Sequence, residues 1–141
     1  MITILFLTIF TNRVVIKGFK KKGLIKCIMP GKIIHLKTRQ ELKEFTNKSN
    51  AFIIDFTASW CGPCKDIKPL VDQAFEQMKT QFDMIIVDAD EGTDICSFMK
   101  VKGFPTLVSF VNKEMVESVV GADIPGIKHF FNSTYQRVFL S

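Results

Sequence analysis

Two cysteines lie close together in the sequence, in the order Cys61-Gly62-Pro63-Cys64. This spacing lets two thiols bridge, and it falls where a buried apolar run gives way to a helical pattern. A thiol at the first turn of a helix faces unpaired N–H groups and the positive end of the helix dipole, which favour the thiolate. Gly62 and Pro63 suit the turn, since the missing N–H of proline would have had no partner there. The pattern predicts dithiol–disulfide exchange, with Cys61 as nucleophile and Cys64, expected to be more buried, as resolving thiol.

A zinc site is the alternative interpretation of the same two cysteines. Zinc in a structural site takes four ligands, commonly a second cysteine pair or a pair of histidines. Elsewhere the chain offers only His35, His129 and two isolated cysteines, Cys27 and Cys96. The sequence therefore favours redox chemistry, and no metal is expected.

An acid interrupts the apolar run that precedes the cysteine pair. Asp55 lies inside the segment Ala51–Thr57, whose apolar residues occupy both faces, as in a central strand buried on both sides. A lone buried acid is costly unless it has a task, so Asp55 is a candidate functional residue. Desolvation is expected to raise its pKa.

Strands and helices alternate along the chain from residue 32 onward. The T-x-x-E pattern of Thr38 and Glu41 is typical of a capping box, and Asn112-Lys113 of a hairpin turn. In the short third helix, Ile95, Phe98 and Met99 are expected to face inward. The order predicts an α/β fold with a central mixed sheet flanked by helices on both faces. The expected strands are 32–36, 51–57, 82–87, 106–111 and 114–120, and the expected helices begin near 38, 61, 93 and 123.

Composition and charge divide the chain into two parts. Hydrophobic residues make up 47% of the 141 residues and charged residues 23%, which is typical of one globular domain. Residues 1–28 hold six of the 19 basic residues and none of the 14 acidic ones, so the remainder is close to neutral. We therefore expect an N-terminal extension over 1–28, a domain over 29–141, and no nucleic-acid partner for that domain.

The extension leaves the cellular location open. Its apolar run over residues 1–10 is shorter than the roughly 20 residues that span a bilayer, so no stable membrane span is expected. Three interpretations remain: a dispensable segment before a start at Met29, a signal or anchor, and an organelle-targeting segment. The first predicts a cytoplasmic protein, the others a secretory or mitochondrial one.

The stretch FIIDFTASWCGPCK over residues 52–65 resembles the active-site segment of thioredoxins. Further features of the resemblance are Pro69 in the long helix, the segment Gly103-Phe104-Pro105-Thr106 before the hairpin, and Gly121. It extends from about Lys32 to about Tyr135. The resemblance implies the thioredoxin fold and a protein-disulfide reductase that serves electron transport and cell redox homeostasis.

The resemblance also implies roles for individual residues. Cys61 and Cys64 would form the redox disulfide, Asp55 would relay a proton to and from Cys64, and Pro105 would be a cis-proline packed against the disulfide. The substrate polypeptide would lie on a surface made by Trp60, Phe104, Gly121 and Ala122. The implied partners are disulfide-containing proteins and a thioredoxin reductase that draws electrons from NADPH. No bound cofactor is implied, and a monomer is expected.

Three features depart from the family pattern. Ile86 occupies a position where many thioredoxins carry a charge near the buried acid, Cys96 is an additional thiol, and the extension with Cys27 has no counterpart. Two other functional classes stay open: a disulfide oxidase or isomerase, and a binding module without catalysis. Gly62-Pro63 disfavours the first, since oxidising relatives usually carry a His there, and the intact cysteine pair with Asp55 disfavours the second.

Overall fold

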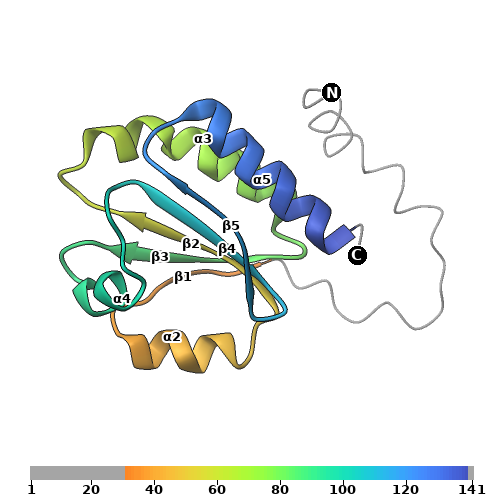
Figure 1. The fold of residues 1–141 in the computed structure, drawn as a ribbon, viewed down its shortest axis with the longest axis horizontal. Helices are drawn as coiled ribbons and strands as arrows, with labels where there is room; N and C mark the ends of the chain where they lie inside the picture. Colours follow the sequence, from red (N-terminus) through yellow and green to blue (C-terminus); the bar gives the residue numbers. More distant parts are fainter. Residues whose placement is uncertain (1–30, 140–141) are drawn as a thin grey trace.

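The computed structural model describes residues 31–139, which form a five-stranded sheet between two pairs of helices (Figure 1). The strand order is β1-β3-β2-β4-β5. The strands β1, β3 and β2 are parallel, whereas β4 pairs antiparallel with β2 and with β5. The predicted mixed sheet is therefore confirmed. The strands are β1 Ile33–His35, β2 Ala51–Thr57, β3 Asp83–Asp88, β4 Thr106–Val111 and β5 Glu114–Val120.

Helices cover both faces of this sheet, as the sequence predicts. In Figure 1, α3 and α5 lie above the sheet, and α2 and α4 lie below it. No helix in residues 31–139 is long and apolar enough to cross a membrane. The helices are α2 Arg39–Thr46, α3 Gly62–Met78, α4 Thr93–Phe98 and α5 Ile124–Phe139.

The central strand β2 contributes to both hydrophobic cores because its side chains alternate between the two faces. Ile53 packs with residues of α3 and α5, whereas Phe52, Ile54 and Phe56 pack with residues of α2 and α4. Asp55 shares its face with Ile53. The acid singled out in the sequence therefore faces the layer that contains α3.

Local sequence signals fix the ends of several elements. The Thr38 side chain accepts a hydrogen bond from the Glu41 N–H, and the Glu41 carboxylate accepts one from the Thr38 N–H, so the predicted capping box is present. Asn112 and Lys113 both have positive φ, at 52° and 68°. This backbone suits a tight hairpin between twisted strands, and the predicted turn is confirmed.

The prediction for the short third helix is wrong at one residue. Ile95 is fully buried and Met99 partly so, but Phe98 is 56% exposed. α4 has only six residues, so a single position, Ile95, is buried within it. The Phe98 ring instead contacts the Arg39 guanidinium, whose carbon lies 5.6 Å from the ring centroid. The extension over 1–28, with Cys27, lies outside the described residues.

Candidate active site

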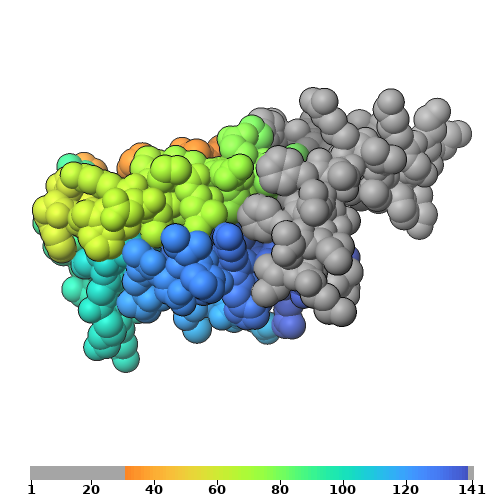
Figure 2. Space-filling model, turned by 90° about the horizontal axis from the view of Figure 1, so that it is seen from above, coloured from red at the N-terminus to blue at the C-terminus, as the bar shows by residue number. Residues whose placement is uncertain are grey.

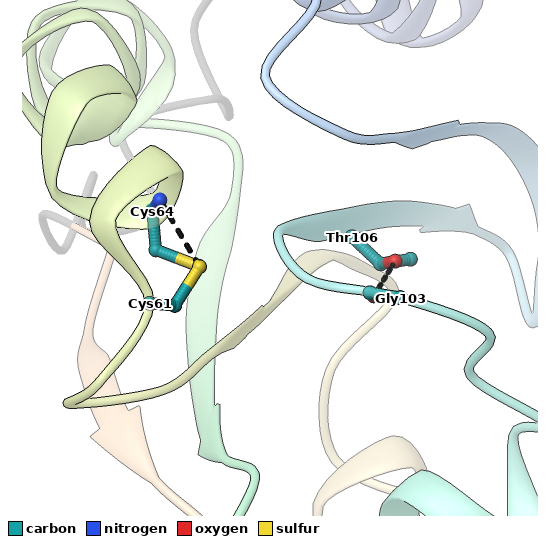
Figure 3. Close-up of a disulfide and its surroundings, with 4 residues drawn as sticks. All are labelled: Cys61, Cys64, Gly103 and Thr106. Atoms are coloured by element: carbon teal, nitrogen blue, oxygen red, sulfur yellow. Dashed lines mark hydrogen bonds between the residues drawn. A yellow bond between two sulfur atoms is a disulfide. The ribbon is translucent and has the colours of Figure 1, made fainter.

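The cysteine pair is located between the end of β2 and the first turn of α3. Cys61 is the N-cap residue of α3, with an extended backbone, and Gly62 and Pro63 are its first helical residues. The sequence folds this way because Pro is well tolerated at the first turn, where its missing N–H leaves no bond unmade. Cys61 and Cys64 form a disulfide with their Cα atoms 5.3 Å apart. The Cys61 Sγ also accepts the backbone N–H of Cys64 at 3.2 Å, as Figure 3 shows.

The two cysteines are equally buried, each 5% exposed, which contradicts the prediction that Cys64 would be the more buried. The disulfide draws both sulfur atoms together against the same neighbours. These neighbours are Ala58, Ala89 and Phe104, which pack with the pair in one small cluster. A substrate disulfide must therefore reach the cysteine sulfur atoms at the exposed edge of this cluster.

The segment before β4 faces the cysteine pair. The Phe104–Pro105 peptide bond is cis, and Pro105 is buried. The Thr106 hydroxyl donates to the Gly103 carbonyl at 2.6 Å and closes the loop that presents the proline (Figure 3). In Figure 2 the beginning of α3 is at one end of the molecule, with the teal segment between α4 and β4 beside it.

A second loop, between β5 and α5, is tied to this segment. The Gly121 N–H donates to the Pro105 carbonyl at 2.7 Å. Gly121 has φ of 90°, a conformation that residues with a Cβ rarely adopt, and the space where a Cβ would lie is open. Ala122, the next residue, is exposed. The structure thus brings together Pro105, Gly121 and Ala122, which are far apart in the sequence.

Two aromatic side chains border the disulfide. Trp60 is 63% exposed, and its ring meets the Phe104 ring edge to face at 5.9 Å. The Trp60 indole N–H also donates to Asp90 at 3.3 Å, which holds the ring in place. Phe104 is partly buried rather than exposed, because it packs against the cysteine cluster. An exposed aromatic ring beside a disulfide offers apolar surface to an incoming polypeptide.

Asp55 lies in apolar surroundings on the α3 side of the sheet. Its register neighbours are Ile86 on β3 and Leu107 on β4, and both pack in the core beneath α3 and α5. Burial raises the pKa of the Asp55 carboxyl from 3.8 to about 6, as the sequence predicts. The cause is that an apolar environment disfavours the charged form.

Two charged residues of α3, overlooked in the sequence, also act on Asp55. The positive charge of Lys68 lowers the pKa of Asp55 and the negative charge of Asp72 raises it, both less than burial does. Lys68 and Asp72 form an exposed ion pair with a separation of 2.9 Å. Lys68 lies four residues beyond Cys64, one turn along the same side of the helix. The four-residue spacing between Cys64 and Lys68 is the sequence signal from which a positive charge near Asp55 could have been predicted.

The remaining thiol is separate from the disulfide. Cys96 is a partly buried, unpaired cysteine on α4. Burial and the negative charge of Asp88 raise the pKa of its thiol. Within residues 31–139 there is no group of three or more His, Cys, Asp or Glu side chains that could hold a metal ion.

A redox-active cysteine pair at the start of a helix, opposite a cis-proline loop on a mixed sheet, defines a thiol–disulfide oxidoreductase. Residues 33–133 match the family model for thioredoxin, and the chain belongs to the thioredoxin family. Thioredoxin-1 of Saccharomyces cerevisiae is 35% identical over 96 residues, which cover 68% of this chain and 92% of that protein. Thioredoxin 1 of Synechococcus elongatus is 35% identical over 80 residues, covering 57% and 75%.

Solved structures agree with this assignment. Mitochondrial thioredoxin 3 from Saccharomyces cerevisiae, in its oxidized form, superposes with a TM-score of 0.63 at 27% identity, over 69% of this chain and 91% of that one. The thioredoxin of Fasciola hepatica gives a TM-score of 0.63 at 25% identity, over 69% and 94%. The fold and the cysteine pair of this chain are therefore those of its family.

Proposed function

We propose that the protein reduces disulfides in other proteins, with Cys61 as the attacking thiolate and Cys64 as the resolving thiol. The observation that carries this proposal is the Cys61–Cys64 disulfide at the first turn of α3. The backbone N–H of Cys64 already points at the Cys61 Sγ. Once the pair is reduced, this donor and the helix dipole stabilise negative charge on Cys61.

Exchange proceeds in two displacements. The Cys61 thiolate attacks one sulfur of a substrate disulfide, forming a mixed disulfide, while the other substrate sulfur leaves as a thiolate and takes up a proton. Cys64, after losing its proton, attacks the Cys61 Sγ and releases the second substrate thiolate. Two electrons pass to the substrate, and the Cys61–Cys64 disulfide is the oxidised product.

We propose that Asp55 accepts the proton that Cys64 loses before its attack. The assignment is supported by the position of Asp55 on the sheet face beneath α3 and by a pKa of about 6, which makes it an effective proton acceptor near neutral pH. Phe104, the neighbour of the buried cis-proline Pro105, packs against the pair. We propose that the surface around Trp60, Phe104, Gly121 and Ala122 holds the substrate backbone.

The oxidised pair must be reduced again for turnover. We propose a thioredoxin reductase fed by NADPH as the electron source, acting on the protein as a monomer. We further propose that residues 29–141 are the working domain, in the cytoplasm unless residues 1–28 direct it to mitochondria or the secretory pathway. The similar structures include a mitochondrial thioredoxin, which supports the mitochondrial alternative.

The test is insulin reduction with NADPH and thioredoxin reductase. The wild-type protein should turn over, Cys61→Ser should be inactive, and Cys64→Ser should accumulate mixed disulfides visible by mass spectrometry. Cys96→Ser is the matched control, since it removes a thiol outside the pair, and should keep full activity. Insulin reduction by Cys61→Ser at the wild-type rate would refute the mechanism.

A further inference from the structure

A groove opens on the sheet face opposite α3, between α2, the end of α4, and strands β2 and β4. Its volume is about 570 Å³, within the range of small-molecule sites. The floor is made of buried apolar side chains: Leu42 of α2 with Phe52 and Ile54 of β2. Because the cysteine pair and Asp55 belong to α3 or to the face beneath it, the groove is separate from the candidate active site.

The walls of the groove are also largely apolar. Phe110 of β4 stacks on Phe52 with ring centroids 5.0 Å apart. At the other end, Met99 and the exposed Phe98 line the opening. The outward position of Phe98, which the sequence does not predict, adds an exposed aromatic ring to the apolar lining of the groove. Such surface indicates a ligand with an apolar body.

The charged residues that line the groove are all basic. Arg39, Lys43 and Lys113 line it, and none of its lining residues is acidic. Arg39 is already bound by Asp94, whose carboxylate lies 2.7 Å from its guanidinium. Among residues 31–139, Lys43 and Lys113 form no ion pair. The uncompensated positive charge therefore belongs to these two lysines.

The topology places the two lysines at the same end of the groove. A short loop reverses the chain between α2 and β2, so the second half of α2, with Lys43, lies beside the start of β2, at Phe52. Phe52 pairs in register with Phe110, three residues before Lys113 in the β4–β5 turn. Figure 1 shows this turn at the same end of the molecule as the C-terminal end of α2. Arg39, at the start of α2, marks the opposite end.

We propose that this groove binds a single-chain anionic amphiphile of the medium-chain fatty acid class. The carboxylate lies between Lys43 and Lys113, and the alkyl chain follows the floor over Phe52 and Ile54 toward Met99. The eight residues of α2 span about 12 Å, which suits an alkyl chain of medium length. Positive charge at one end and apolar surface along the rest match a ligand with one charged head and one tail.

The experiment titrates the ¹⁵N-labelled, full-length oxidised protein with dodecanoate below its micelle concentration, using calorimetry and amide chemical shifts. Dodecyltrimethylammonium, with the same chain and opposite charge, tests the head group. We expect saturable dodecanoate binding with shifts in α2, at Phe110 and in the β4–β5 turn. Lys43→Glu and Lys113→Glu should each weaken binding roughly 5-fold, since each removes an attraction and adds a repulsion.

The matched control is Lys128→Glu, an exposed lysine on α5 across the sheet, which should leave dodecanoate binding unchanged. All three variants should reduce insulin like the wild type, which shows that they are folded. The proposal is overturned by absence of dodecanoate binding, by shifts that map elsewhere, by equal binding of the cationic amphiphile, or by affinities that neither Lys43→Glu nor Lys113→Glu changes.

Discussion

Replacing Asp55 by Asn removes a titratable group from an apolar site while nearly preserving its shape. In the wild type, Ile86 and Leu107 flank this carboxyl on the neighbouring strands, and burial raises its pKa from 3.8 to about 6. A raised folded pKa means that the folded protein binds the proton more tightly than the unfolded chain does. Asp55 therefore favours folding fully below about pH 4, and this contribution is lost as the pH rises through about 6.

The magnitude follows from the two pKa values. Relative to acidic pH, ionisation of Asp55 lowers the free energy of unfolding by about 1.5 kcal/mol at pH 5 and about 3 kcal/mol at pH 8. These are upper values, because Asp55 is only partly buried and retains some solvation. Asn cannot ionise, so Asp55→Asn should be more stable than the wild type, with an advantage that grows from pH 5 to pH 8.

The assay is urea unfolding of both oxidised proteins at the two pH values, together with insulin reduction. Activity should fall in Asp55→Asn because Cys64 loses its proton acceptor, by up to about 10²–10⁴-fold for loss of a general base. Asp66→Asn, a change of an exposed acid on α3, is the matched control and should alter neither the pH dependence nor the activity. If Asp55→Asn is strongly destabilised at pH 8 and fully active, Asp55 is a structural acid and the proton relay is refuted.

Three further changes test other parts of the molecule. Lys68→Gln should raise the pKa of Asp55 and Asp72→Asn should lower it, because their charges act in opposite directions; carbon-detected NMR titration of the Asp55 carboxyl checks this, and shifts of the same sign would contradict it. A protein of residues 29–141 should fold cooperatively and reduce insulin at the full-length rate; insolubility or a large loss of activity would show that 1–28 belongs to the domain. In the reduced protein at pH 7, iodoacetamide should alkylate Cys61 before Cys96, whose thiol pKa is raised by burial and Asp88; peptide mass spectrometry gives the order, and equal rates would contradict the argument.

Features encoded by neighbouring residues could be predicted from the sequence. The capping box of Thr38 and Glu41 and the turn at Asn112-Lys113 depend on side chains and backbone angles within four residues. The same holds for the start of α3, where Gly62 and Pro63 follow the N-cap. Such signals depend only on residues close in the sequence and not on tertiary packing. They therefore predict the helices, the hairpin and the location of the cysteine pair.

Features created by packing between distant elements could not be predicted in this way. Phe98 faces outward, and its ring contacts the guanidinium of Arg39, 59 residues earlier in the chain. Cys61 is as buried as Cys64 because both belong to one cluster, against which Phe104 and Ala89 pack. The periodicity of a short helix or the position of a residue along it does not contain this information. Both exceptions lie at sites for which we propose ligands, the groove and the disulfide.

Apolar residues flank Asp55 on the sheet, whereas its charged neighbours belong to α3. Ile86 leaves the strand beside Asp55 without a charge, and Leu107 does the same on the other side. The positive charge that acts on Asp55 comes instead from Lys68, on the helix that carries Cys64. Lys68 is exposed and forms an ion pair with Asp72. The carboxylate of Asp72 and dissolved salt therefore both weaken the effect of the Lys68 charge on the pKa of Asp55. Burial therefore dominates the pKa of Asp55, and this pKa should respond less to ionic strength than to any change at Ile86 that admits water or charge.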